Sequence, residues 1–314
     1  MSVASGTASS HIDLLSKLRT FITSTASVAD RWTELRYVTT SGAEELILRS
    51  TNVGVQAYVG IKAYTSSLSS NYAFILNGYT GYSGDPFYEL GGAMQASENL
   101  IALPLTNSTI DYWFIANNRC IKIIAKIGSI YHQAYLGLML PYFLPSHWTY
   151  PLCIGGSGLA NIEGVPVLNN VTGTSVHAFW KPTNAGLTSS SNQVGTLAVR
   201  DFRNQWIRPY NDKAFTNNSL ASGTWPYCQS IRQTNFSSMT NLRNNLDNSS
   251  YTLLPIIVCD AGTVSLLGEL DGIKYTTGYG NSSGDTIVVG GTSHLCVPNV
   301  YRTGDGDYCA YKLA

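Results

Sequence analysis

The residues that most resemble a catalytic set are carboxylates in the last quarter of the sequence. Glu269 and Asp271 alternate along a strand-like run, so both side chains are expected to project from one face. Paired carboxylates of this kind perform glycoside hydrolysis. Asp260 and Asp285 are candidates to join them, and residues 280–285 have the Gly, Asn and Asp content of a calcium loop without the EF-hand spacing. A polysaccharide-degrading site is one hypothesis, and a simple turn followed by a strand is the other.

Other motifs that could support catalysis are incomplete. The five histidines are isolated from one another, and His132 lies between tyrosines, which favours a hydrogen-bonded structural role. In Gly155-Gly-Ser-Gly158 a glycine follows Ser157 directly, unlike the Gly-x-Ser-x-Gly turn that presents a nucleophile. The same segment lacks the βαβ pattern of a dinucleotide site. We therefore predict no catalytic residue, no cofactor and no metal site, and a protein that is not an enzyme.

Six cysteines are spread over the chain without a Cys-x-x-Cys pair or a histidine at ligand spacing, which argues against zinc. They are Cys120, Cys153, Cys228, Cys259, Cys296 and Cys309. An even number on distant strands allows disulfides of unknown pairing, within or between subunits. The alternative is a set of buried free thiols that pack as small apolar side chains.

Tyrosine is unusually abundant, with 20 residues, and three tyrosines occur in sequence typical of a loop: Tyr79, Tyr82 and Tyr88. Tyrosines serve at protein interfaces and stack on sugar rings. We interpret these three as candidate interface aromatics, whereas most of the others are expected to pack within strands.

Composition narrows the class of partner. Charged residues make up only 12% of the chain, and 19 basic residues balance 19 acidic ones. A net charge of zero argues against electrostatic binding to nucleic acid or to an anionic membrane. It also favours a subunit whose surface is buried in an assembly over a freely soluble monomer. No apolar run is long enough to span a bilayer, and residues 1–10 look like a short flexible arm rather than a secretory signal.

The periodicity predicts one helix and many strands. From His11 to about Thr25, apolar residues recur every three or four positions after the cap residue Ser10. Residues 55–64 alternate between apolar and other side chains, as a half-buried strand does. Asn117 and Asn118 separate two strand-like runs, and their tolerance of the left-handed conformation indicates a tight hairpin. Further strands are expected at 33–38, 45–49, 72–76, 101–105, 251–259, 264–268, 286–289 and 295–301.

The fold class is therefore mainly β (α+β), with an N-terminal helix packed on an antiparallel sheet and a second β-rich, loop-rich region. The Gly-rich segment near Gly155 is the expected boundary, because it should end strand pairing. It divides the chain into residues 1–154 and residues 155–314, of which the second contains long polar loops.

The order of several motifs resembles a recurrent family of tailed-bacteriophage virion proteins. The matching segments are Tyr112–Arg119, Ala125–Tyr131, Tyr135–Gly137, Leu140–Tyr142, Pro145–Ser146, Tyr150–Leu152, Ile154–Ser157, Gly268–Ile273, Gly278–Asn281, Asp285–Ile287, Asn299–Gly304 and Asp307–Tyr308. The helix at Leu14–Ile22 also matches, so the resemblance spans nearly the whole chain. Asn118 stands where the family tends to have glycine, and the cysteines are additional.

The resemblance implies a non-enzymatic structural protein of the tail, baseplate, neck or collar. It would be synthesised in the bacterial host cytoplasm, be found in the virion, and pack against copies of itself and other virion proteins. The alternative is a receptor- or glycan-binding module at the tail tip or fibre, which contacts a host-surface glycan through the polar loops of residues 185–224.

Overall fold

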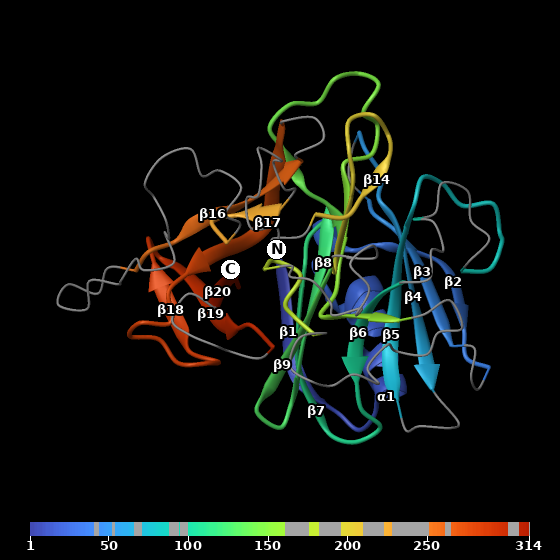
Figure 1. Ribbon diagram of the computed structural model, residues 1–314. Helices are drawn as coiled ribbons and strands as arrows, with labels where there is room; N and C mark the ends of the chain where they lie inside the picture. Colours follow the sequence, from blue (N-terminus) through green and yellow to red (C-terminus); the bar gives the residue numbers. More distant parts are fainter. Residues whose placement is uncertain are drawn as a thin grey trace, which may run out of the picture.

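The computed structural model is mainly β, as expected: three antiparallel sheets lie side by side, and one short α-helix packs between two of them (Figure 1). The structure describes residues 1–40, 44–51, 54–65, 71–87, 94, 100–160, 176–181, 196–209, 223–227, 251–260, 265–300 and 308–313. Within these ranges, no helix has the length and apolar character needed to cross a membrane.

The middle layer is the central sheet, which has seven strands. In spatial order they are β1 (Ser2–Ala8), β7 (Ile110–Ala116), β8 (Cys120–Ile127), β9 (Ile130–Leu138), β11 (Leu152–Gly155), β13 (Leu197–Arg200) and β14 (Trp206–Ile207). The strands β7 and β8 form the hairpin predicted around Asn117.

The helix-side sheet has six strands: β12 (Gly158–Ala160), β6 (Leu100–Leu105), β5 (Tyr72–Tyr79), β4 (Tyr58–Thr65), β3 (Glu45–Arg49) and β2 (Thr33–Val38). The predicted strands at 33–38 and 45–49 have the predicted bounds. The alternation predicted for residues 55–64 is also confirmed, since Ala57, Val59 and Ile61 are all buried in one core.

The C-terminal sheet contains β15 (Gly223–Trp225), β16 (Leu254–Asp260), β17 (Ser265–Thr276), β20 (Tyr308–Lys312), β19 (Thr292–Pro298) and β18 (Thr286–Val289). The short strand β10 (Leu140–Pro141) leaves the central sheet and pairs with β17 at Glu269 and Gly268. The first half of the chain is thereby joined directly to the C-terminal sheet.

The helix α1 (His11–Thr20) continues as a π-helical turn, Phe21–Thr25, so the predicted helical segment is confirmed. Its start is capped on both sides: Ser10 Oγ accepts a hydrogen bond from the Asp13 backbone N–H at 3.1 Å, and an Asp13 oxygen accepts one from the Ser9 N–H at 2.8 Å. A 3-10 turn at Val28–Asp30 leads into β2. The buried face of the helix consists of His11, Leu14, Leu15 and Leu18.

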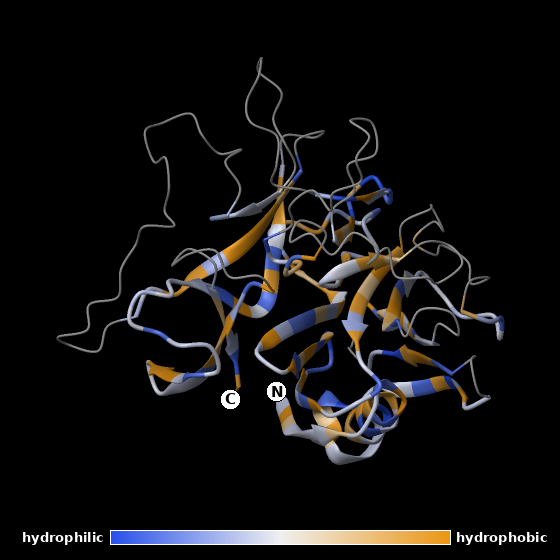
Figure 2. Cartoon of the chain, turned by 60° about the horizontal axis from the view of Figure 1, so that its bottom comes forward, coloured by the Kyte–Doolittle hydropathy of each residue, from blue (hydrophilic) through white to orange (hydrophobic). Residues whose placement is uncertain are grey.

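The central sheet buries side chains on both faces, because its strands alternate between two cores. On β8, Ile121 and Ile123 face the first core, shared with α1 and the helix-side sheet, whereas Ile124 faces the second core, shared with the C-terminal sheet. The hydrophobic stretches, drawn in orange, follow the strands of the three sheets (Figure 2). The layered core is therefore organised around the central sheet.

The N-terminal segment differs from the prediction of a flexible arm. Residues Ser2–Ala8 form β1, which pairs with the whole length of β7, from Ser2 opposite Ala116 to Ala8 opposite Ile110. Alternating small residues made this stretch look unstructured, but small side chains fit an edge strand whose hydrogen-bonding partner is supplied 100 residues later. The prediction used only the residues of this segment, whereas the strand forms because it pairs with β7, which is distant in the sequence.

The Gly-rich boundary is also corrected. Its position after residue 154 falls inside β11, where Ile154 is paired with Leu136 of β9 on one side and Ala198 of β13 on the other. The chain then enters β12 of the helix-side sheet, so residues 155–314 contribute strands to both sheets of the first half. The glycines are needed for close packing: a Cβ on Gly156 would collide with the Ala102 carbonyl, and one on Gly155 with the Phe179 ring.

Candidate binding surface

The predicted carboxylates of the C-terminal sheet each have partners within the chain. A Glu269 oxygen accepts a hydrogen bond from the Tyr142 hydroxyl at 3.0 Å, and the other lies 3.0 Å from Lys274 Nζ. Asp271 Oδ2 accepts a hydrogen bond from Asn117 Nδ2 at 3.0 Å. The two carboxylates thus fasten β17 to different neighbours, which gives a structural account of both.

The remaining acidic candidates are also engaged. Asp260 lies 3.5 Å from Arg203 Nη2. Asp285 accepts a hydrogen bond from the Ser282 N–H at 2.6 Å, which closes the 280–285 segment as a turn before β18. Nowhere in the described ranges do three or more His, Cys, Asp or Glu residues gather so as to hold a metal ion.

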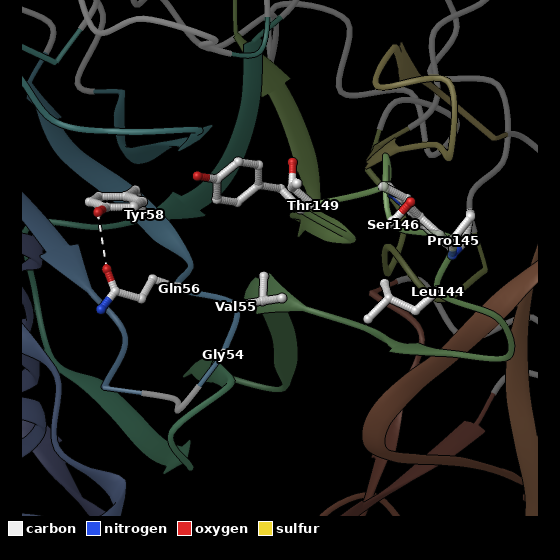
Figure 3. A pocket seen from close by; sticks show the side chains of 10 residues that line it. Gly54, Val55, Gln56, Tyr58, Leu144, Pro145, Ser146 and Thr149 are labelled. Carbon is white, nitrogen blue, oxygen red and sulfur yellow. Dashed lines mark hydrogen bonds between the residues drawn. The ribbon is translucent and has the colours of Figure 1, made fainter.

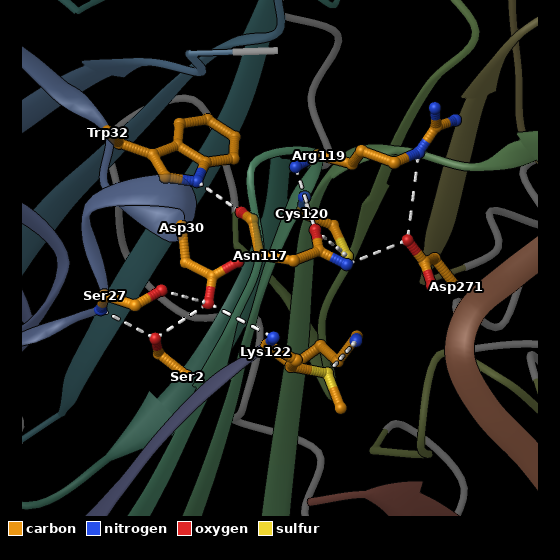
Figure 4. A network of polar contacts seen from close by, with 10 residues as sticks. Ser2, Ser27, Asp30, Trp32, Asn117, Arg119, Cys120, Lys122 and Asp271 are labelled. Atoms are coloured by element: carbon orange, nitrogen blue, oxygen red, sulfur yellow. Dashed lines mark hydrogen bonds and ion pairs between the residues drawn. The ribbon is translucent and has the colours of Figure 1, made fainter. Parts of the chain in front are cut away.

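Asn117 connects all three layers (Figure 4). Its carbonyl oxygen accepts a hydrogen bond from Trp32 Nε1 at 2.8 Å, and its side-chain oxygen accepts bonds from the backbone N–H groups of Arg119 and Cys120, at 2.8 and 2.9 Å. The expected left-handed turn is wrong, because Asn204 is the one residue other than glycine with positive φ in the described segments. The asparagine side chain closes the hairpin instead.

Gln133 is the polar centre of the second core. Its side-chain oxygen accepts hydrogen bonds from Trp180 Nε1 at 2.5 Å and from the Tyr311 hydroxyl at 2.7 Å, and its amide nitrogen donates to the Pro298 carbonyl at 2.7 Å. Ser157 Oγ accepts a hydrogen bond from the Gln133 N–H at 2.6 Å and donates to its carbonyl at 3.0 Å. Ser157 is fully buried, so its hydroxyl serves the fold.

The hydrogen bonding of His132 differs from the prediction. A hydrogen-bonded histidine was predicted, but the side chain is buried and its Nδ1 has no hydrogen-bond partner among the described residues. Burial lowers the pKa of this imidazole to about 4. The side chain is therefore a neutral member of the core at physiological pH.

The five described cysteines, at 120, 153, 259, 296 and 309, are buried free thiols, whereas Cys228 lies outside the described residues. Cys120 and Cys153 both face Gly137 of β9, one from each side, so a whole strand separates them. Because two strand spacings separate them, the Cα atoms of Cys120 and Cys153 are expected to be roughly 9.5 Å apart. That distance is too long for a disulfide. Burial raises the pKa of Cys120 to about 11 and that of Cys296 to about 12.

Of the three candidate interface tyrosines, the two that the structure describes, Tyr79 and Tyr82, do not form an exposed surface. Tyr79 is fully buried at the end of β5, where its hydroxyl donates to the Phe87 carbonyl at 2.7 Å. The sequence around it resembled a loop because Gly78 precedes it, but a Cβ at this position would lie 3.0 Å from side-chain atoms of Ile154 and Trp206, so tight packing favours glycine there. Tyr82 is half-buried against the same core, and Tyr88 lies outside the described residues.

An exposed apolar patch lies instead on the segment that crosses from the central sheet to the C-terminal sheet. Its members are Leu140, Tyr142, Phe143, Leu144 and Leu266, whose side chains are 38% to 52% exposed. Tyr142 is held by a backbone hydrogen bond to the Leu267 carbonyl at 3.1 Å. The Phe143 ring rests against Phe202, with the centroids 5.6 Å apart. The sequence carried a local signal for this patch, since four apolar or aromatic residues, Leu140, Tyr142, Phe143 and Leu144, flank Pro141.

A pocket with a volume of about 350 Å³ opens beside this patch, and Leu144 belongs to both (Figure 3). One wall is the segment before β4, and the other is the connection between β10 and β11. The lining residues are Gly54, Val55, Gln56, Tyr58, Leu144, Pro145, Ser146, Trp148, Thr149 and Tyr150. No local pattern in the sequence indicates this pocket, because its two walls are about 90 positions apart in the chain.

The polar loops proposed as a receptor contact are mostly outside the described structure, which covers only residues 196–209 and 223–224 of the range 185–224. No protein-family model matches this chain, and no curated protein matches it. The structure and its surface therefore carry the argument about function.

Proposed function

We propose that this chain is a non-enzymatic structural subunit of a tailed-bacteriophage virion, in the tail, baseplate, neck or collar, and that it acts by packing against copies of itself and other virion proteins. The exposed patch formed by Leu140, Tyr142, Phe143, Leu144 and Leu266 is the observation that carries the proposal. Contiguous exposed apolar side chains of this kind mark protein interaction sites.

The architecture supports a packing role. The patch sits on a backbone fixed by β10 pairing with β17 and by the Tyr142–Leu267 hydrogen bond, so its shape is set before a partner arrives. A preformed surface loses less conformational entropy on association than a mobile one. Neutral overall charge removes long-range repulsion between identical subunits.

Self-association is tested by sedimentation of the purified protein at increasing concentration. We expect the wild type to associate and the double variant Tyr142→Ser with Leu144→Ser to remain monomeric. The matched control is Val28→Ser with Val288→Ser, which removes two exposed valines elsewhere and should associate as the wild type does. A wild type that stays monomeric, or a patch variant that still associates, would contradict a role for the patch in self-packing.

The place in the particle is tested by cryo-electron microscopy of the virion that carries this chain. A symmetric ring or sleeve, with residues 140–144 covered by a neighbour, is the expected result. A copy at a distal tip with residues 185–224 free in solvent would instead favour the receptor-binding alternative.

A further inference from the structure

The pocket beside the apolar patch has walls with two kinds of chemistry. Aromatic rings come from the half-buried Tyr58 and Tyr150, whereas Trp148, which also lines the pocket, is only 1% exposed. The Trp148 indole N–H donates to the Arg200 carbonyl at 3.0 Å, and the Arg200 guanidinium lies 5.6 Å from the centre of the Tyr150 ring. Tyr58 Oη donates to the Gln56 side-chain oxygen at 3.1 Å. The rings therefore form a prearranged apolar wall.

Short polar groups line the rest of the pocket. Gln56 retains its amide N–H₂ group after its oxygen has accepted the bond from Tyr58, and Ser146 and Thr149 are exposed hydroxyl residues on the opposite wall. Figure 3 shows Gln56 and Tyr58 on one side, with Ser146 and Pro145 across from them. Donors and acceptors are thus set around an aromatic and aliphatic surface.

All ten lining residues are uncharged. A ligand with a phosphate or a carboxylate would find no cationic side chain in the lining, since the Arg200 guanidinium is held over the Tyr150 ring, and its charge would lose hydration on binding. A purely apolar ligand would leave the amide and hydroxyl groups without partners. The matching ligand has a flat apolar face and a rim of neutral hydroxyl groups, and it must fit about 350 Å³, near the small end of the range for ligand pockets.

We propose that this pocket binds one or two neutral pyranose units of a saccharide, with the sugar face against the aromatic wall and its hydroxyl groups bonded to Gln56, Ser146 and Thr149. This site is separate from residues 185–224, and the proposal does not depend on the packing role of the chain. A ligand with so few atoms is expected to bind with a dissociation constant on the order of 1 mM.

The test is ¹³C-methyl NMR titration of the wild-type protein with glucose, galactose, N-acetylglucosamine and lactose, each up to 50-fold excess. We expect saturable shifts of the Val55 and Leu144 methyl signals with at least one sugar, and no shift at Val28 or Val288, which are exposed elsewhere. No saturable shift with any of the four sugars would overturn the proposal. So would shifts at Val28 and Val288 as large as those at Val55.

Two blocking variants test the location independently. Thr149→Trp and Ser146→Trp add a bulky ring to exposed positions of the pocket rim, and each should weaken binding at least tenfold. Thr286→Trp is the matched control, because Thr286 is an exposed threonine on β18 in the C-terminal sheet, and it should bind as the wild type does. Unchanged binding in both rim variants would overturn the assignment. A proline-rich hexapeptide that shifts the same methyl signals while the sugars do not would also overturn it.

Discussion

The two faces of the central sheet differ in chemistry although the same strands supply both. Toward α1 and the helix-side sheet, the side chains of β8 and β9 are almost entirely aliphatic, such as Ile121, Ile123 and Leu136. Toward the C-terminal sheet, the same strands bury Lys122 and Gln133 and also Tyr135, whose hydroxyl donates to the Leu138 carbonyl at 2.7 Å. The helix-side interface depends mainly on buried apolar area, with the Trp32–Asn117 hydrogen bond in addition, whereas the other interface also buries a network of hydrogen bonds around Gln133.

This difference implies different tolerance to substitution. An aliphatic interface accepts side chains of similar volume, because apolar burial is not directional. A buried hydrogen-bond network fixes one arrangement, since each unpaired group costs its full desolvation energy. The C-terminal sheet is therefore expected to have a single docking geometry on the central sheet, which agrees with the packing role that we propose for the exposed patch at their junction.

The largest expected effect is that of Gln133→Leu, which keeps the approximate side-chain volume but removes the amide at the centre of the hydrogen-bond network. Trp180 Nε1 and the Tyr311 hydroxyl would both lose their acceptor inside the core. We expect a loss of about 4 kcal/mol in the free energy of unfolding, measured by urea denaturation. The control on the other face is Leu136→Met, which should cost less than about 1.5 kcal/mol. Equal losses for the two variants would show that the two interfaces do not differ.

The next effect concerns pH and the aliphatic face, which carries His132 at one end of β9. The folded-state pKa of about 4 lies below the ordinary histidine pKa of about 6.5. The neutral form is therefore favoured by folding, so the stability is complete above pH 6.5 and is lost as the pH falls toward 4. At pH 4.5 this group alone should cost about 2.5 kcal/mol relative to pH 7.5.

Guanidinium unfolding of the wild type and of His132→Leu at the two pH values isolates that contribution. The variant should lose about 2.5 kcal/mol less than the wild type on acidification, because His11 and the carboxylates act in both proteins. The same pH dependence in both proteins would show that His132 is not held neutral by the core.

The layered comparison also shows which parts of the fold were predictable from sequence. Strand bounds such as 33–38 and the buried positions Val59 and Ile61 were recoverable, because period-two alternation is a local signal. The pairing of β1 with β7 and the crossing at Gly155 were not, because each depends on a partner distant in the chain. The network around Gln133 could not be predicted either, since no local pattern shows which of the seven glutamines will be buried.

The candidate site was less predictable than the fold. Tyr79 looked like a surface residue because its neighbours are turn formers, yet long-range contacts bury it. Tyr58 and Tyr150 line the same pocket although they are distant in the sequence. No rule of local residue spacing predicts that they lie close together. Only the apolar run at residues 140–144 was visible locally.

The smallest effect tests the residue that touches both interfaces. Asn117→Ala removes the hydrogen bonds that close the β7–β8 hairpin and the bond to Asp271, and we expect a loss of about 2 kcal/mol by urea denaturation. Asn118→Ala is the matched control and should stay within about 0.5 kcal/mol of the wild type. Asp271→Ala removes the bond from Asn117 and the 3.8 Å ion pair with Arg119, which both link the layers, and it leaves the hydrogen bonds within the hairpin in place. If Asp271→Ala lowers the free energy of unfolding by about 1 kcal/mol, the hairpin bonds and the link to the C-terminal sheet share the effect of Asn117→Ala. If the two variants lose the same free energy, the side-chain bonds within the hairpin add nothing to stability and the attachment of the C-terminal sheet accounts for the whole loss.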